Sequence, residues 1–273
     1  MLAIIQILLS IIMTVLYSIA ISVSFDLLGV LSVLLIFIVS NLLVILGLFI
    51  IFVIFIYLTE KITPKSLWKH WVVHHYNVYM FRFFYRVRLI VTGKENLPKN
   101  MNFVVFSNHI EYTDPLYIMQ AYKRFPIGFV AKDPLFKYPV LKNLMIGAGC
   151  IPITRFADRS ALESIIKSIK QVKDGQPMGI FPEGKRTYCN DLIEFKPGAF
   201  KLPQKAKADI SPVCLFNMHD LSKKWRIWPT KVYMHILPIV PYEKTKDLDS
   251  VQLSKLIFDV INEQMNQFKN NKE

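Results

Sequence analysis

The first 59 residues constrain this chain most, because they are almost entirely apolar. One charged side chain, Asp26, interrupts the stretch from Met1 to Thr59, and no lysine or arginine occurs in it. A membrane-spanning helix needs about 20 consecutive apolar residues, so the block is long enough for two spans with a turn near residues 24–29. It is too long for the apolar part of a signal peptide, and no basic segment precedes it. We therefore expect a membrane-embedded helical hairpin over residues 1–59.

The residues that follow this block indicate its orientation. Lys61, Lys65 and Lys69 come directly after the second apolar segment. By the positive-inside rule, this end faces the cytoplasm, and a hairpin then places the N-terminus on the same side. The expectation is thus a cell-membrane protein whose remaining part is cytoplasmic. The sequence leaves one alternative open, a single tilted span with the first segment lying along the interface.

The rest of the chain is strongly basic. All 33 lysines and arginines follow Glu60, and 18 of the 20 acidic residues accompany them. Such a part commonly meets nucleic acid, anionic lipid head groups or phosphorylated small molecules. The apolar block favours lipid, and we expect no nucleic-acid partner. Residues 60–87 mix aromatic and basic side chains, which favours an amphipathic helix in the head-group layer. A helix that packs its aromatic residues into a core is the alternative.

From residue 88 the pattern is typical of an α/β domain that extends to residue 273. We expect a mixed, mostly parallel central sheet flanked by helices. Cys150, Cys189 and Cys214 are far apart and show no metal-ligand spacing, so neither a disulfide framework nor a metal site is predicted. The expected strands are 103–106, 126–132, 150–154, 177–181, 210–216 and 231–240, and the expected helices are 114–125, 138–149, 160–175 and 250–268.

A histidine and an aspartate follow the first of these strands. Asn108 and His109 come directly after it, and Asp114 is five residues beyond the histidine. At that spacing His109 and Asp114 do not share a helix face, so they meet only if the chain turns between them. A carboxylate bound to one imidazole nitrogen leaves the other free to accept a proton from a hydroxyl. The alternative is that Asp114 caps the next helix and His109 fills a turn.

Two further polar clusters follow later strands. Arg155 ends a segment of small and apolar residues, and arginine is a natural bidentate partner for phosphate. The segment FPEGKRT places Glu183, Gly184, Lys185 and Arg186 after another strand, where a flexible glycine and two cations suit a phosphomonoester. Taken alone, Arg155 is better explained as a surface arginine after an edge strand, and FPEGKRT as a charged hairpin turn.

The three clusters in this order resemble the glycerolipid acyltransferases of the lysophosphatidic acid acyltransferase type. Their first motif, NHxxxxD, is matched by NHIEYTD at residues 108–114, and their third, FPEGTRS, by FPEGKRT at residues 181–187. The second motif ends in an arginine, here Arg155, and the fourth is an apolar strand with a proline, here residues 210–213. The resemblance covers residues 91–240. Lys185 replaces a threonine and Thr187 a serine of the third motif.

This resemblance implies a reaction and roles for the residues. A fatty acyl group would pass from acyl-CoA or acyl carrier protein to the sn-2 hydroxyl of lysophosphatidic acid, giving phosphatidic acid for phospholipid biosynthesis without a cofactor. His109 would be the general base and Asp114 would orient it. Acceptor binding would fall to Arg155, Glu183, Gly184, Lys185 and Arg186. Glycerol-3-phosphate or another lysophospholipid is an alternative acceptor, and a non-catalytic protein that binds anionic lipid is the alternative of another class.

Overall fold

A computed structural model describes the chain except residues 25, 155–158, 223–227 and 271–273. The chain divides into two compact units, Met1–Thr59 and Glu60–Glu273. Each unit has its own pattern of buried residues, and each is therefore described separately.

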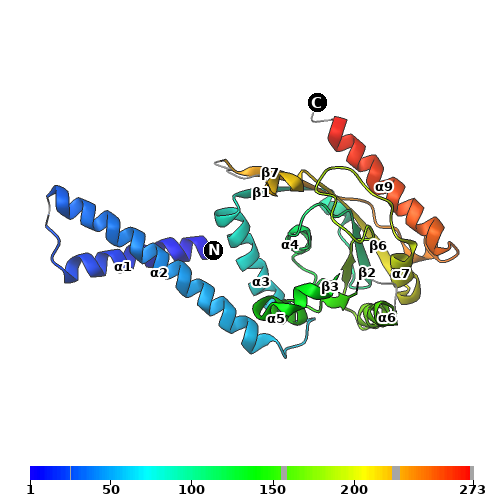
Figure 1. Cartoon of the computed structure of the whole chain (residues 1–273), viewed down its shortest axis with the longest axis horizontal. Helices are drawn as coiled ribbons and strands as arrows, with labels where there is room; N and C mark the ends of the chain where they lie inside the picture. The colour runs from blue at the N-terminus through cyan, green and yellow to red at the C-terminus, as the bar shows by residue number, and fades with distance from the viewer. Residues whose placement is uncertain (25, 155–158, 223–227, 271–273) are drawn as a thin grey trace. The chain divides into compact units, whose positions relative to one another are not determined.

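The first unit is a helical hairpin made of α1 (Leu2–Ala20) and α2 (Leu27–Thr59), coloured blue in Figure 1. Both helices are long and apolar enough to cross a membrane. At the turn, Asp26 Oδ1 accepts hydrogen bonds from the Ser24 hydroxyl and the Gly29 N–H. Helix α2 has 33 residues, about 50 Å at 1.5 Å per residue, so it exceeds the thickness of a bilayer's hydrocarbon core.

The second unit is built on a seven-stranded sheet. Its strands lie in the order β1-β7-β6-β2-β5-β3-β4, and every neighbouring pair is parallel except β6 and β7. The predicted mixed, mostly parallel sheet is therefore confirmed, although β1 was not among the predicted strands. The bounds are β1 Val87–Thr92, β2 Phe103–Ser107, β3 Gly128–Lys132, β4 Ile151–Ile153, β5 Met178–Ile180, β6 Asp209–Phe216 and β7 Thr230–Ile236.

Helices and short turns connect these strands. Within residues 60–87, helix α3 begins at Leu67 and passes into a π-helical turn, η1, so the segment is not helical from its first residue. The helices are α3 Leu67–Tyr79, α4 Asp114–Ala121, α5 Pro139–Gly147, α6 Arg159–Lys173, α7 Lys201–Ala206, α8 Tyr242–Thr245 and α9 Ser250–Asn270; the shorter turns are η1 Met80–Phe84, η2 Lys94–Asn96, η3 Asp133–Lys137, η4 Pro197–Phe200 and η5 Met218–Ser222.

Strand β2 shows why the sheet is covered on both sides. Successive side chains of a strand point to opposite faces. Phe103 and Val105 pack in one apolar cluster with residues of α4, whereas Val104 and Phe106 pack in another with residues of α7 and α9. Figure 1 shows α4 and α9 on opposite sides of β2 and β6. A strand buried on both faces is apolar throughout, which explains the unbroken run FVVF.

The register of the sheet brings the predicted clusters together. Val104 pairs with Met178 and Phe106 with Ile180, so β2 and β5 are parallel neighbours that end at the same edge. The chain leaves β2 toward His109 and leaves β5 toward Glu183. Strands β3 and β4 end at this edge too. Polar residues that follow different strands therefore meet there, as is usual at the carboxyl edge of an open α/β sheet.

Candidate active site

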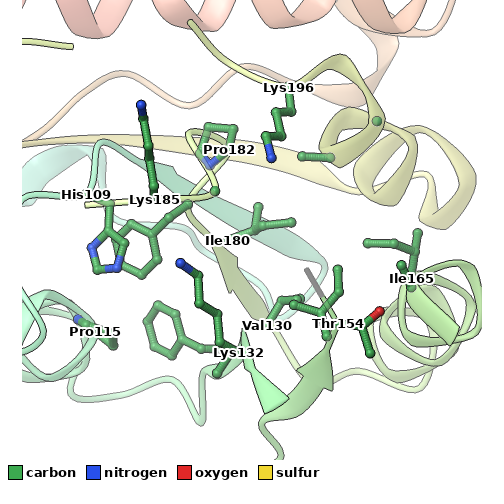
Figure 2. A pocket seen from close by; sticks show the side chains of 18 of the residues that line it. His109, Pro115, Val130, Lys132, Thr154, Ile165, Ile180, Pro182, Lys185 and Lys196 are labelled. Carbon is green, nitrogen blue, oxygen red and sulfur yellow. The ribbon is translucent and has the colours of Figure 1, made fainter. Parts of the chain in front are cut away.

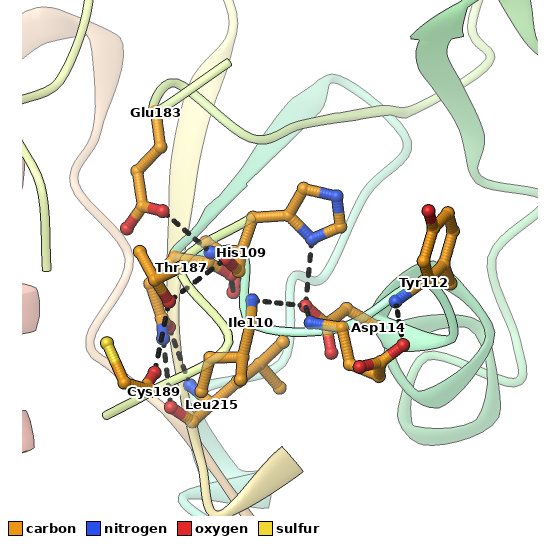
Figure 3. Close-up of polar contacts among 11 residues, drawn as sticks. His109, Ile110, Tyr112, Asp114, Glu183, Thr187, Cys189 and Leu215 are labelled. Atoms are coloured by element: carbon orange, nitrogen blue, oxygen red, sulfur yellow. Dashed lines mark hydrogen bonds and ion pairs between the residues drawn. The ribbon is translucent and has the colours of Figure 1, made fainter. Parts of the chain in front are cut away.

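His109 and Asp114 form a hydrogen-bonded pair at this edge. Asp114 Oδ2 lies 2.8 Å from His109 Nδ1 and also accepts the backbone N–H groups of Ile110 at 2.6 Å and Glu111 at 2.9 Å (Figure 3). Asp114 is the first residue of α4, whose N-cap is Thr113. The Asp114 side chain thus turns back toward the histidine, and the helix-cap alternative is wrong.

Burial and hydrogen bonding act on Asp114 in opposite directions. The side chain is fully buried, and this raises the pKa of the carboxyl above its ordinary value, while the hydrogen bonds from His109 and the two backbone N–H groups limit the rise. Because a carboxylate only accepts hydrogen bonds, it holds the imidazole proton on Nδ1. His109 Nε2 is then left with a lone pair that can take a proton from a substrate.

A phenylalanine supports the imidazole from the side. The His109 ring stacks on Phe181, with centroids 4.1 Å apart and planes 21° apart, and Phe181 in turn stacks on Phe129 at 5.9 Å. Phe181 is the first residue of FPEGKRT, which was singled out for its charged residues. The stack and the Asp114 hydrogen bond together restrict both the tilt and the position of the imidazole.

Backbone hydrogen bonds join the first and third motifs. The His109 N–H donates to Glu183 Oε2 at 3.3 Å, and the Thr187 N–H donates to the His109 carbonyl at 2.9 Å (Figure 3). The Tyr188 N–H donates to the Ile110 carbonyl at 3.2 Å. The loops after β2 and β5 are thereby held in one arrangement, and the residues that they carry keep fixed relative positions.

Glu183 is a buried acid beside this junction. Its side chain is almost fully buried, which raises its pKa from an ordinary 4.5 to about 8, with a smaller contribution from the nearby charge of Asp114. The carboxyl therefore keeps its proton at neutral pH. A neutral carboxyl can donate a hydrogen bond and does not repel a nearby anion.

Asn108 and Gly184 have structural reasons for their identities. The Asn108 side chain donates to the Leu215 carbonyl at 2.9 Å and accepts the Leu215 N–H at 2.8 Å, which ties the end of β2 to β6. Gly184 has a φ of +68°, and a Cβ there would lie 2.9 Å from Lys196 Nζ. Both requirements favour glycine, because other residues rarely adopt this backbone conformation.

Two of the three predicted cations, Lys185 and Arg186, lie at the pocket. Arg186 lies at the pocket with its guanidinium carbon 3.3 Å from the centroid of the Tyr112 ring. Lys185 is exposed and lines the same pocket. Arg155 lies outside the described residues, so its predicted position next to these groups stays a prediction.

A pocket of about 820 Å³ opens beside His109 and has a charged part and an apolar part. Figure 2 shows Lys132 and Lys185 beside His109, with Ile180, Val130 and Ile165 farther from it and Lys196 on the other side of Pro182. Sequence reasoning missed Lys132 and Lys196, although Lys132 ends a strand at the same sheet edge. The apolar part is lined by Phe129, Val130, Ala131, Leu135, Ile153, Ala161, Leu162, Ile165, Ile180, Phe181 and Ala199.

Helix α6 contributes to the apolar part in a way that its pattern did not predict. The helical spacing of Leu162, Ile166 and Val172 predicts that they share a buried apolar stripe, but Leu162 and Ile166 are 60% and 55% exposed. Val172 is buried as expected. Leu162 faces the pocket, because α6 turns one edge of its apolar stripe toward the pocket and away from the sheet.

Comparison with known proteins assigns this chain to a family. The sequence model of the Acyltransferase family matches residues 88–216. A 1-acyl-sn-glycerol-3-phosphate acyltransferase of Borreliella burgdorferi is 34% identical over 177 residues, which are 64% of this chain and 70% of that protein. The chain belongs to the acyltransferase family. The family resemblance inferred from NHIEYTD and FPEGKRT is thereby confirmed.

Other acyltransferases show how far the similarity extends. The Saccharomyces cerevisiae 1-acyl-sn-glycerol-3-phosphate acyltransferase is 32% identical over 165 residues, 58% of this chain and 53% of the yeast protein. The matched part thus spans about half the length of that relative. The crystal structure of PlsC, the 1-acyl-sn-glycerophosphate acyltransferase of Thermotoga maritima, has a TM-score of 0.64 at 22% identity. It covers 79% of this chain and 87% of its own chain, and it shows that the fold is shared.

Proposed function

We propose that this acyltransferase transfers a fatty acyl group from a thioester to the sn-2 hydroxyl of lysophosphatidic acid, giving phosphatidic acid. The observation that carries the proposal is the His109–Asp114 pair at the mouth of a pocket that is cationic near His109 and apolar beyond it. The acceptor has a matching form, with a phosphate and a hydroxyl at one end and an acyl chain at the other. Similar proteins of bacteria and yeast that carry the name 1-acyl-sn-glycerol-3-phosphate acyltransferase support the same assignment.

His109 would act as the general base. Its Nε2 takes the proton of the acceptor hydroxyl while the hydroxyl oxygen attacks the carbonyl carbon of the thioester. A carbon–oxygen bond forms, the carbon–sulfur bond breaks, and the proton passes to the departing thiolate. Asp114 stabilises the imidazolium that exists between these two proton transfers and keeps the ring in its productive tautomer.

The cations around His109 would bind the phosphate of the acceptor. Arg186 offers a planar pair of donors, and Lys185 adds a charge that the usual threonine of this motif would lack. We also keep the prediction that Arg155 contributes. Glu183 in its neutral form can orient the acceptor hydroxyl or the glycerol backbone, and Gly184 leaves room beside it for the ligand.

The apolar part of the pocket would hold an acyl chain. Val130, Ile165 and Ile180 line this part (Figure 2). Each methylene moved there from water contributes about 0.8 kcal/mol. The donor is acyl-CoA or acyl carrier protein, both anionic, and the basic surface attracts either of them. No further cofactor is required by this chemistry.

The membrane placement follows from the first unit and its flanking charges. We infer that the hairpin spans the cell membrane with both ends on the cytoplasmic side, because the lysines that follow α2 favour that side. Trp68 and Trp71 of α3 are about half exposed, which suits a segment at the head-group layer. Labelling of a cysteine introduced at Ser24, which should react only from the outer side, measures this orientation.

The test is acyl transfer by the purified protein in lipid. Lysophosphatidic acid is supplied first with acyl-CoA and then with acyl carrier protein, and phosphatidic acid is followed by mass. The parent should form product, and His109→Ala should lose at least about a thousandfold in rate. His75→Ala, which changes a histidine of α3 outside the pocket lining, is the matched control.

The outcomes separate the alternatives. Product from the parent but not from His109→Ala supports the base and names the donor. Equal rates for the parent and His109→Ala would exclude the assigned base. Product only with glycerol-3-phosphate or another lysophospholipid would replace the acceptor. Binding to anionic liposomes without transfer to any of these acceptors would favour the non-catalytic alternative.

A further inference from the structure

Arg186 lies against two tyrosines. Its guanidinium carbon is 3.3 Å from the centroid of the Tyr112 ring and 5.7 Å from that of Tyr188. The two rings are 6.4 Å apart, with planes inclined by 53°. Tyr112 belongs to the loop after β2, three residues beyond His109, and Tyr188 belongs to the loop after β5. The cation is therefore held by aromatic groups from both loops of the site.

These rings have no evident part in the hydrophobic core. Tyr112 is 58% exposed and Tyr188 is 47% exposed. An exposed tyrosine that only fills a surface position needs no defined conformation. Tyr188, however, has a φ of +55°, in a region that residues other than glycine rarely adopt. Such a conformation persists where the surroundings impose it.

Hydrogen bonds impose this arrangement on both loops. The Tyr188 N–H donates to the Ile110 carbonyl, and the Thr187 N–H donates to the His109 carbonyl. The Tyr112 N–H donates to Glu111 Oε1 at 3.0 Å (Figure 3). The backbone that follows Arg186 is thus attached to the backbone of His109 and Ile110, and both rings lie near the guanidinium.

Stacking has a consequence that an ion pair would not have. A cation over a ring face is attracted to the π electrons, and a stacked guanidinium keeps its N–H groups in the plane away from the ring. A carboxylate partner would occupy those N–H groups instead. Within the described residues no carboxylate forms an ion pair with Arg186, and its Nε is buried without a hydrogen-bond partner. The ring thus holds the guanidinium in position, and its Nη groups, which bond to no other described residue, remain available to a ligand.

We propose that Tyr112 and Tyr188 are positioning residues that hold the Arg186 guanidinium in place for the phosphate monoester of the acceptor. This inference rests on the proposed function, because it assigns the held cation to the acceptor's phosphate. The rings contact the arginine and fix its distance from His109. Their removal should weaken acceptor binding and leave the proton transfer at His109 nearly unchanged.

A substitution series at Tyr112 tests the proposal. Tyr112→Leu removes the π face and should raise the KM for lysophosphatidic acid about fivefold, while kcat and the KM for the thioester donor change less than twofold. Tyr112→Phe keeps the ring and should restore the KM to within twofold of the parent. Tyr112→Trp offers the strongest cation–π partner and should give a KM at or below the parental value. A purely structural loss would not follow this order.

Matched variants show whether the ring acts through the arginine. Tyr188→Leu should raise the acceptor KM by a smaller factor, because its ring lies farther from the guanidinium. Tyr138→Leu, an exposed tyrosine outside the pocket lining, is the control and should leave both KM values unchanged. In an Arg186→Lys background, Tyr112→Leu should change the acceptor KM less than twofold, since an ammonium cannot stack as a flat guanidinium does.

The positioning role and the proposed function are overturned by different results. An active parent whose Tyr112→Leu and Tyr112→Phe variants have the same acceptor KM overturns the positioning role. So does a fivefold effect that persists with Lys at position 186, or a donor KM that rises as much as the acceptor KM. If Tyr112→Leu does not fold, as judged by thermal unfolding, the Trp and Phe variants and Tyr188→Leu decide the matter. A parent that makes no phosphatidic acid overturns the proposed function first, and the positioning role with it.

Discussion

The helical hairpin and the α/β domain bury opposite kinds of residue. In the hairpin, Gln6, Ser10 and Thr14 are buried, whereas leucines such as Leu27 and Leu28 are exposed. In the α/β domain, the phenylalanines of β2 are buried completely. Water drives apolar groups inward, but hydrocarbon exerts no such force, and there helices associate through polar and small residues. The two regions are therefore suited to different solvents.

Both regions also bury polar groups. In the hairpin these groups are neutral and serve packing, whereas in the α/β domain they include ionisable groups that lie at the site. Gln6 Nε2 donates to Asn41 Oδ1 at 2.7 Å, and the Ser10 hydroxyl donates to the same oxygen at 3.3 Å. These groups are neutral and join α1 to α2. The α/β domain instead buries carboxyl groups, and two of them, Asp114 and Glu183, accept hydrogen bonds from His109. Ionisable groups kept from water at this cost indicate a site.

If the buried carboxyl groups of the α/β domain serve catalysis, the largest effect on kcat is expected from a substitution at Asp114. Asp114→Asn keeps the size of the side chain but favours the wrong imidazole tautomer, since an amide N–H can donate to Nδ1. We expect kcat to fall by about 10³ with little change in acceptor KM. Steady-state kinetics in lipid measure both constants, and flotation with membranes should be the same as for the parent. A fall of less than tenfold in kcat would show that the buried carboxylate does not orient the base.

A pH-dependent effect of intermediate size is expected at Glu183. Its folded-state pKa of about 8 exceeds the ordinary 4.5, so between these pH values the folded protein keeps a proton that the unfolded chain has lost. The contribution of this group to the free energy of unfolding therefore falls as pH rises from about 5 to about 8. Glu183→Gln removes this penalty and should raise the Tm at pH 8.5 by about 5 °C. The difference between variant and parent should disappear near pH 5.

Thermal unfolding of both proteins across this pH range provides the measurement. Asp249→Asn changes an acid at the start of α9, outside the pocket lining, and provides the control. A difference between Glu183→Gln and the parent that is constant with pH would mean that Glu183 is already ionised at neutral pH, and it would remove the reason for expecting a neutral carboxyl beside the acceptor.

The smallest effect is expected in the hairpin. Asn41→Leu removes the acceptor for Gln6 and Ser10, and hydrogen bonds between helices within membranes contribute about 0.6 kcal/mol on average. The stability of the hairpin in lipid nanodiscs should fall by about that amount, while kcat stays within twofold. Leu42→Ala changes an exposed neighbour and is the control. A large loss of activity from Asn41→Leu would contradict the view that the buried polar groups of the hairpin serve helix packing and not catalysis.

The sequence alone determined the features that depend on residue type and on short-range pattern. The 59-residue apolar block predicted two helices, and both are present. Runs such as FVVF predicted strands, and their alternation with amphipathic helices predicted a mostly parallel sheet. NHIEYTD and FPEGKRT predicted the family because residue order along the chain is itself the signal.

The tertiary structure decided what depends on contacts between distant segments. Asp114 fits a helix cap or a catalytic partner equally well by sequence, and only the turn after β2 shows that its carboxylate faces His109. Strand β1 was missed because Val87–Thr92 is a short run broken by an arginine, and its pairing with β7 along the sheet edge makes it a strand. Helix periodicity placed Leu162 on a buried stripe, yet the position of α6 beside the pocket exposes it. The stacking of Tyr112 on Arg186 joins residues 74 positions apart, and no local pattern carries that information.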